Sequence, residues 1–356
     1  SRAMNSYIVT IATPVLDEAL ALTASCGGVS SKCTVDQANF KIAGNDNDTY
    51  ATHAYVTVAG TDGTTPDLSA AKFLVKGPDD ADYREVKATN KGSYFVIEGL
   101  TPGAANRVKV AIGDDVCRPI TLNAEAVVQL PNAGLEEHGN GSNHNEQTFA
   151  NWGTNNPMTT SQGINQDYTR YSGTATTAGR TGQGVDLRTC GWGSGNKIWW
   201  SVASSTVKYI DAGLLHLGSS RTTRPSGYGD RTGYLNTDDL DCGIAFSSRP
   251  KSLSFYYKYT SKNADDRGFA EIWVKDAGGA IIAKNEVSLA SADDWTLANI
   301  ELDYPFGSKK GAKIYVRFQS TNQAACLEKN ETNFTMHTAQ AFVASHLYID
   351  DIELIY

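Results

Sequence analysis

The chain has 356 residues, 40% of them hydrophobic, and a formal net charge of −8. This length favours two domains, because single cores rarely grow beyond ~250 residues. The dispersed lysines and arginines exclude the concentrated basic surface that nucleic-acid binding needs, and no apolar run approaches the ~20 residues that span a bilayer.

The first 128 residues read as a β domain. Segments rich in β-branched and aromatic residues, bounded by Gly, Pro, Asp and Asn, predict strands at Tyr7–Ala12, Ala54–Gly60, Phe73–Lys76, Tyr94–Glu98 and Arg107–Ile112. Short strands at this spacing favour a sandwich or a barrel. Cys26 and Cys33 have a spacing that could staple a hairpin, and the alternative is that all six cysteines are buried thiols.

The segment Tyr94–Gly113, "YFVIEGLTPGAANRVKVAIG", joins a strand to an alternating strand through a Gly-Leu-Thr-Pro-Gly corner. This arrangement resembles the late strands of fibronectin type III domains, although Asn106 stands near the place of the usual corner tyrosine. The resemblance implies an immunoglobulin-like β-sandwich over residues 1–128.

The composition changes after Pro131. Twelve of the 33 glycines fall between Gly134 and Gly195, which indicates long loops. Strands are predicted again at Ser252–Tyr259, Ala270–Lys275, Leu297–Leu302, Lys313–Gln319 and His346–Ile355. Residues 129–356 therefore form a second all-β domain.

Four motifs of this second part carry a family resemblance: "LPNAGLEE" at Leu130–Glu137, "NW" at Asn151-Trp152, "FSSRPKSLSFYYKY" at Phe246–Tyr259 and "LYIDDIELIY" at Leu347–Tyr356. Together they resemble the PCMD family, named for a carbohydrate metabolism domain. The family occurs in exported, often lipid-anchored proteins of Gram-negative bacteria that process glycans. The resemblance therefore implies a polysaccharide partner and a place at the outer membrane, the cell surface or in the periplasm.

The two ends of this part also resemble jelly-roll carbohydrate-binding modules, with Leu135 where phenylalanine is usual and His138 where tryptophan is common. This resemblance implies a jelly roll whose first strand is Leu130–Gly141. The opening Ser1–Met4 does not resemble a natural start, which leaves room for an export signal or a lipid-anchoring cysteine before it.

The jelly-roll resemblance brings the first and last strands together, and with them Glu136 and Asp350. Calcium takes six to eight oxygen ligands, and Asn132, Glu136 and Asp350 could supply part of such a shell. Strand alternation puts Asp350 in phase with Ile352 and Leu354 and turns Asp351 the other way. The alternative is that these acids cap strands at the surface.

Sugar binding needs aromatic rings for the C–H faces of the sugar and planar polar groups for its hydroxyls. If the apolar residues of each late strand face the core, alternation leaves a second aromatic and polar set on the opposite face. We predict the glycan site there, with Trp273 and Tyr315 as stacking platforms and Glu271, Arg317, Gln319 and Tyr256 around them. In the alternative, loops cover this face and its aromatics form a second core.

The loop "CGWGSGNKIWW", Cys190–Trp200, offers a second aromatic group. Trp192 and Trp199 could complete the cleft, or they could plug the sandwich.

Catalytic signals are weak, because HExxH, GxSxG and P-loop patterns are absent from the sequence. The adjacent aspartate pairs favour turns, since glycoside hydrolysis needs two carboxyls that face each other. The sequence thus predicts a glycan-binding protein without catalysis. A polysaccharide hydrolase or lyase and a surface adhesion protein are the alternatives.

Overall fold

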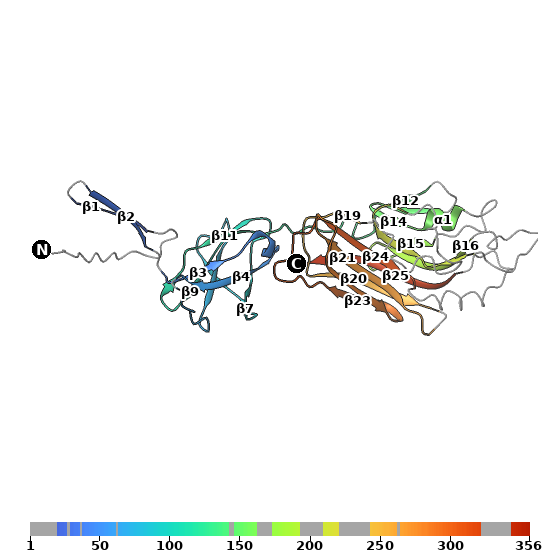
Figure 1. The fold of residues 1–356 in the computed structure, drawn as a ribbon. Helices are drawn as coiled ribbons and strands as arrows, with labels where there is room; N and C mark the ends of the chain where they lie inside the picture. Colours follow the sequence, from blue (N-terminus) through green and yellow to red (C-terminus); the bar gives the residue numbers. More distant parts are fainter. Residues whose placement is uncertain are drawn as a thin grey trace, which may run out of the picture. The chain divides into compact units, whose positions relative to one another are not determined.

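The computed structural model describes residues 20–26, 29–35, 38–61, 63–141, 146–161, 173–192, 209–220, 243–261, 264–321 and 343–356. The chain divides into two compact units, Ser1–Val127 (unit 1) and Val128–Tyr356 (unit 2). Strands dominate both units (Figure 1), which confirms the predicted all-β class. No helix among the described residues is long and apolar enough to cross a membrane.

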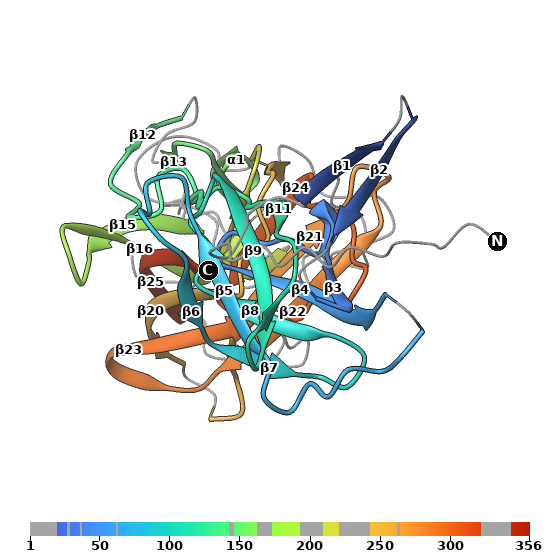
Figure 2. The ribbon, with the colours of Figure 1, turned by 90° about the vertical axis from the view of Figure 1, so that its left-hand side faces the viewer.

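Unit 1 is built from two facing sheets and a separate hairpin (Figure 2). One sheet contains β5 (Lys72–Lys76), β6 (Arg84–Val86), β9 (Ala105–Ile112), β10 (Asp115–Val116) and β11 (Ile120–Asn123). The other contains β3 (Phe40–Ala43), β4 (His53–Gly60), β7 (Ala88–Asn90) and β8 (Phe95–Glu98), with the 3-10 turn η1 (Asp46–Asp48) before β4. Four predicted strands match β4, β5, β8 and β9, whereas Tyr7–Ala12 lies outside the described residues.

The Gly99–Gly103 corner of unit 1 is held by Asn106, whose side chain is fully buried. Its Oδ1 accepts a hydrogen bond from the Thr101 amide (2.8 Å), and its Nδ2 donates to the carbonyls of Thr101 and Ala104 (3.0 Å each). A tyrosine corner also bonds back to backbone a few residues upstream. Asn106 therefore performs the corner bonding that the missing tyrosine would perform, while membership of the immunoglobulin-like class stays a prediction.

Cys26 and Cys33 do lie in a hairpin, formed by β1 (Leu20–Cys26) and β2 (Val29–Val35). The backbone register, however, pairs Cys26 with Val29 and Cys33 with Leu22. Four residues of strand separate the two positions by roughly 13 Å, and a disulfide needs Cα atoms within about 7 Å. A disulfide between them, one of the two alternatives that the sequence left open, does not fit this register.

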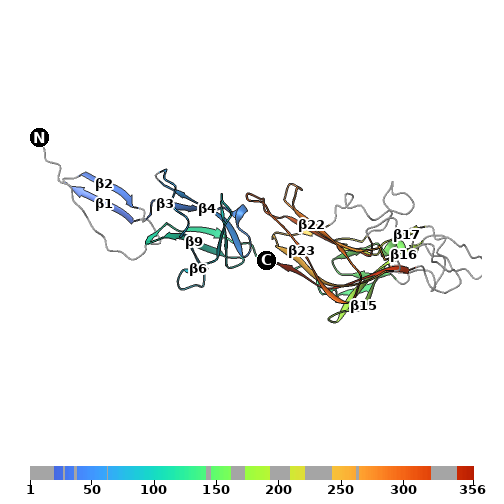
Figure 3. The ribbon, with the colours of Figure 1, turned by 90° about the horizontal axis from the view of Figure 1, so that it is seen from below.

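Unit 2 is a sandwich of two antiparallel sheets between which the chain passes repeatedly, as in a jelly roll (Figures 1 and 3). The eight-stranded sheet contains β12 (His138–Asn140), β13 (Gln147–Phe149), β14 (Trp152–Thr154), β18 (Leu214–Leu217), β19 (Ile244–Ala245), β21 (Gly268–Lys275), β22 (Ile281–Leu289) and β24 (Lys313–Gln319). The six-stranded sheet contains β15 (Thr174–Ala178), β16 (Gln183–Trp192), β17 (Tyr209–Asp211), β20 (Ser252–Thr260), β23 (Ala292–Glu301) and β25 (Val343–Ile355).

The core of unit 2 fills the space between these sheets. Strand alternation predicted the inward residues of three strands, and all are buried: Leu253, Phe255, Tyr257 and Tyr259 of β20, Ala270, Ile272 and Val274 of β21, and Ile314, Val316 and Phe318 of β24. The Phe255 and Phe318 rings meet edge to face across the two sheets, with centroids 4.9 Å apart. The period of two thus fixed which side chains enter the core.

The opening segment of unit 2 differs from the expected strand Leu130–Gly141. Residues 131–134 form a turn, and the strand β12 covers only His138–Asn140. Asn132 and Leu135 have φ values of +46° and +57°, which an extended strand does not allow. The Asn132 side chain stabilises the turn through hydrogen bonds with the amide and carbonyl of Glu137 and the carbonyl of Ala150.

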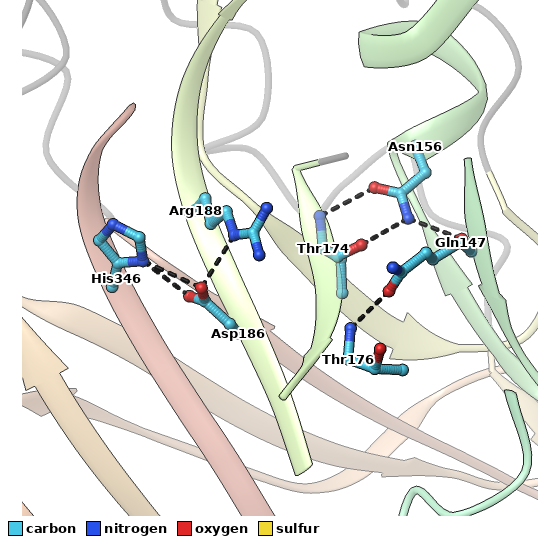
Figure 4. A network of polar contacts seen from close by, with 7 residues as sticks. All are labelled: Gln147, Asn156, Thr174, Thr176, Asp186, Arg188 and His346. Atoms are coloured by element: carbon cyan, nitrogen blue, oxygen red, sulfur yellow. Dashed lines mark hydrogen bonds and ion pairs between the residues drawn. The ribbon is translucent and has the colours of Figure 1, made fainter. Parts of the chain in front are cut away.

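A buried amide network ties the two sheets together beside the helix α1 (Asn156–Ser161) (Figure 4). The Asn156 side chain donates to the carbonyls of Gln147 on β13 and Thr174 on β15, and it accepts from the Thr174 amide. The Gln147 side chain accepts from the Thr176 amide of β15. The network joins β13, next to the edge of the eight-stranded sheet, to β15 at the edge of the six-stranded sheet.

The ends of unit 2 are bound to each other. The Gln129 side chain donates to the Leu354 carbonyl (2.7 Å) and accepts from its amide (2.8 Å), and the Tyr356 hydroxyl donates to the Val128 carbonyl (2.7 Å). We expect a fragment Val128–Tyr356 to unfold in one cooperative transition by circular dichroism. A fragment that starts at Leu130 loses these bonds, and its free energy of unfolding should fall by about 1–3 kcal/mol. An insoluble or non-cooperative Val128–Tyr356 would contradict the separation of the domains.

Candidate functional site

The outer face of the eight-stranded sheet gathers five of the predicted site residues. β21 and β24 are antiparallel neighbours, in which Glu271 lies opposite Arg317 and Trp273 opposite Tyr315. Gln319 lies two residues beyond Arg317, opposite Phe269. We call Glu271, Trp273, Tyr315, Arg317 and Gln319 the eight-strand outer face, because they alternate with the core residues of both strands.

The side chains of this face are buried to the same degree as those of the core. Trp273 is 4% exposed, Arg317 is 3% exposed, and the other three residues are fully buried. The Trp273 and Tyr315 rings are stacked with centroids 4.9 Å apart, and the Lys275 ammonium lies 4.4 Å from the Trp273 centroid. The rings are therefore inside the protein, which is the arrangement that the second-core alternative expects.

Charge distinguishes this face from an ordinary core. The Glu271 carboxylate lies 3.3 Å from the Arg317 Nε and 3.6 Å from the Lys284 Nζ. Burial raises the pKa of Glu271, and the two cations only partly offset that effect. The Lys284 side chain is 38% exposed, so the cluster reaches solvent on the side of β22.

His216 belongs to the same face, although no sequence signal pointed to it. It lies on β18 opposite Arg317, is fully buried, and has its ring centroid 6.0 Å from that of Tyr315. Gly153, which lies opposite His216 on β14, approaches so closely that a side chain there would meet the His216 ring at 2.8 Å. Only the pairing of β18 with β24 brings this histidine to the cluster.

Tyr256 lies elsewhere. Its strand β20 belongs to the six-stranded sheet, so Tyr256 does not share a face with Trp273 or Tyr315. Its ring instead carries the Arg180 guanidinium, 3.9 Å from the centroid. Trp192 ends β16, where its backbone pairs with Tyr209, and Trp199 lies outside the described residues.

Two of the three predicted metal ligands meet at one turn, Gly179–Gln183, between β15 and β16. The Asp350 Oδ2 accepts from the amides of Arg180 (2.6 Å) and Thr181 (2.9 Å), and the Glu136 carboxylate accepts from the Gln183 amide (3.0 and 3.1 Å). A side chain at Gly179 or at Gly182 would overlap Asp350 or Glu136, respectively. Glycine at these positions thus lets both carboxylates approach the backbone.

The third predicted ligand, Asn132, is not at this turn, because its amide is bound to the backbone of Glu137 and Ala150. Burial raises the pKa of Asp350, against the amides that stabilise its charge. Among the described residues, no group of three or more His, Cys, Asp or Glu side chains is arranged to hold a metal ion. A metal shell here would need backbone carbonyls of the turn.

Asp351 corrects the prediction from alternation. It was expected to turn away from Asp350, yet its carboxylate accepts from the Thr181 hydroxyl (2.8 Å) and pairs with Arg180 (2.6 Å) at the same turn. Asp351 has φ +48°, and the register of β25 with β20 shifts at this point. The bulge changes the phase, so Ile352 and Leu354 enter the core while Asp350 does not share their face.

Comparison with known proteins confirms the family resemblance. Residues 134–278 match the family model described as PCMD: Putative carbohydrate metabolism domain. No curated protein matched the chain.

Solved structures match with low similarity. One represents carbohydrate-binding modules of the β-sandwich superfamily, with TM-score 0.28 and 8% identity, covering 90% of this chain and 98% of that chain. Another is TmCBM61 in complex with β-1,4-galactotriose, with TM-score 0.29 and 10% identity over 64% and 96%. A family 11 carbohydrate-binding module from Clostridium thermocellum has TM-score 0.24 and 12% identity over 58% and 89%.

Proposed function

We propose that this protein is a non-catalytic glycan-binding protein whose unit 2 recognises an oligosaccharide or polysaccharide. The PCMD match over residues 134–278 supports a carbohydrate context. The observation that carries the proposal is the ion-paired Glu271 and Arg317 beside the stacked Trp273 and Tyr315. Aromatic faces and planar polar groups are the two things that a sugar needs from a protein.

A purely structural second core has no need of these ions. Burying a carboxylate and a guanidinium costs more than packing apolar residues of the same volume. Buried acids with perturbed pKa values gather at functional sites, and the pKa of Glu271 is raised by burial. In this proposal Trp273 and Tyr315 stack on the sugar, Glu271, Arg317 and Gln319 bind its hydroxyls, and entry begins beside the half-exposed Lys284.

The proposal is tested by Glu271→Gln, with Glu286→Gln as its matched control. Glu286 lies opposite Glu271 on β22 and is exposed. We expect a glycan array to identify a ligand for the wild-type protein. Glu271→Gln, assayed where circular dichroism shows it folded, should weaken binding about tenfold or more, and Glu286→Gln should bind normally.

The same two variants also test the alternative that the protein is an enzyme. A retaining or inverting hydrolase needs two facing carboxyls, and these two glutamates are cross-strand neighbours. Release of reducing sugar by the wild type, abolished by either substitution, would establish catalysis. If both variants bind the glycan as well as the wild type does, Glu271 is not part of the site. If the wild type binds another protein and no glycan, adhesion is the better reading of its function.

An exported protein held at the outer membrane or cell surface by a lipid anchor, or located in the periplasm, is the setting that the family resemblance supports for this function. There unit 1 would place unit 2 away from the anchor.

Calcium is the cofactor that we propose for unit 2, bound at the Gly179–Gln183 turn. Carboxylates and backbone carbonyls are the hard oxygen donors that calcium prefers, and this turn brings the Glu136 and Asp350 carboxylates to one stretch of backbone. Glu136 and Asp350 would hold it, and the ion would neutralise the charge that burial makes costly at Asp350.

We expect a chelator to lower the melting temperature of the purified protein and added calcium to restore it, because an ion that binds only the folded state stabilises it by mass action. Glu136→Gln should abolish this shift, while Glu137→Gln, next to it and exposed, should keep it. A wild-type melting temperature that changes with neither chelator nor calcium would show that no calcium ion stabilises the fold.

A further inference from the structure

The opposite surface of unit 2 presents aromatic rings that are open to solvent. We call it the six-strand outer face, defined by Asp186 and Arg188 of β16, His346 and Tyr348 of β25, Tyr256 and Lys258 of β20, and Trp295 of β23. Strand pairing places Asp186 opposite Tyr348 and Tyr348 opposite Lys258. The Lys258 ammonium in turn reaches Trp295 on the next strand.

These rings differ from those of the eight-strand outer face in their exposure. Tyr256, Trp295 and Tyr348 are all partly exposed, whereas Trp273 and Tyr315 are at most 4% exposed. The row from Trp295 to Asp186 crosses four neighbouring strands, or about 14 Å. That length suits several sugar rings in a row better than a single small molecule.

One cation, Lys258, lies in the middle of this row between two aromatic rings. The Lys258 ammonium is 4.9 Å from the Trp295 centroid and 5.2 Å from the Tyr348 centroid, and it forms no ion pair with any residue that the structure describes. Both rings attract the ammonium, because the face of an aromatic ring stabilises a nearby cation. Lys258 is therefore a positive charge already positioned between two stacking platforms.

The acids of β16 and β25 nearest to this row are bound to other partners, whereas Asp293, Asp294, Glu301 and Glu353 on or beside the face are exposed, and none of them pairs with Lys258. Asp186 accepts from the Arg188 Nε (2.8 Å) and contacts the His346 Nδ1 (3.0 Å) (Figure 4). Asp350 accepts backbone amides, and Asp351 pairs with Arg180. The positive charge between the two rings is that of Lys258, so the group that complements this position is an anion on a ligand with apolar ring faces.

We infer that the six-strand outer face binds an acidic glycan, a chain of sugars that carry carboxylate or sulfate groups. The sugar rings stack on Trp295 and Tyr348, and the anionic group pairs with Lys258 between them. Because both sites take saccharides, this inference extends the proposed function, but it uses different residues on the opposite sheet. An experiment can therefore disprove one of the two sites without disproving the other.

The test measures binding of the full chain to polygalacturonate, alginate and chondroitin sulfate by affinity electrophoresis and calorimetry. Methyl-esterified polygalacturonate is the matched ligand control, because it keeps the sugar backbone and removes its charge. We expect binding to at least one acidic polymer, weaker binding to the ester, and weakening as salt rises, because added ions screen exposed charges.

The variants are Lys258→Gln and Trp295→Ala, with Lys41→Gln, an exposed strand lysine of unit 1, as control. The first two should weaken binding of the acidic polymer about tenfold, while Lys41→Gln leaves it unchanged. No binding to any of the three polymers, or equal binding by Lys258→Gln and Lys41→Gln, overturns the inference. Loss of acidic-polymer binding in Glu271→Gln alone would assign the ligand to the eight-strand outer face instead.

Discussion

Replacing Trp273 by alanine should lower the free energy of unfolding by about 3–5 kcal/mol, because a buried tryptophan loses its transfer free energy and leaves a cavity. Trp273 is 4% exposed and stacks on Tyr315, so the neighbouring ring loses a partner as well. For a domain of this size the melting temperature should fall by roughly 6–20 °C. Thermal and urea unfolding of the variant measure both quantities.

Trp295→Ala is the matched control for this experiment, because it removes the same side chain from a partly exposed position on the other sheet. We expect it to cost much less stability. A Trp273→Ala variant as stable as Trp295→Ala would show that Trp273 is not buried in solution.

Glycan binding by Trp273→Ala shows whether the eight-strand outer face is a glycan site or a second core. If a ligand stacks on Trp273, its loss should weaken binding about tenfold to a hundredfold at temperatures where the variant is folded. Normal binding together with the large loss of stability would assign this face to a second core. The proposed site would then be wrong, while glycan binding elsewhere on unit 2 could stand.

Strand alternation explains why much of the sandwich was predictable. A strand such as Lys313–Gln319 carries its whole core set, Ile314, Val316 and Phe318, in alternate positions. Its other face, with Tyr315 and Arg317, follows without knowledge of any partner strand. The pairing of Trp273 with Tyr315 additionally needed the register, which no local pattern gives.

The errors occurred where the backbone leaves the extended region. Leu135 was expected in a strand, but its φ of +57° belongs to a turn that an asparagine side chain stabilises. Asp351 was expected to face away from Asp350, and its φ of +48° at a bulge reverses that. Positive φ at leucine or aspartate has no sequence signal comparable with that of glycine.

The sequence could predict neither which sheet a strand joins nor whether the second face of that strand is covered. Tyr256 was grouped with Trp273 because both alternate with core residues, yet their strands belong to different sheets. Alternation cannot report whether a second face is covered, and Arg317 at 3% exposure would be read as a surface residue from its type alone. His216 reaches the cluster only through the pairing of β18 with β24.

Substitution of Arg317 should also reduce the stability of unit 2 strongly. Arg317→Met removes the guanidinium but keeps an apolar stem, and it leaves the Glu271 carboxylate buried beside Lys284 alone. Removing one partner of a buried ion pair costs about 3–5 kcal/mol, and we expect a loss of this order in urea unfolding at neutral pH. The double variant Glu271→Gln/Arg317→Met removes both charges and should recover most of that loss.

The pH dependence of Arg317→Met gives this prediction its sharpest form. Arg317 lowers the pKa of Glu271 while burial raises it, so its removal should raise the pKa of the folded state further above the unfolded value of about 4.3. The folded variant then binds the Glu271 proton more tightly than the unfolded chain does, and stability rises as pH falls through the folded pKa. We therefore expect the deficit of Arg317→Met against wild type to shrink from about pH 8 to about pH 5, and the double variant to lack this trend. A deficit that is constant with pH would mean that Arg317 stabilises unit 2 by packing, and that its charge is not needed to hold Glu271 ionised.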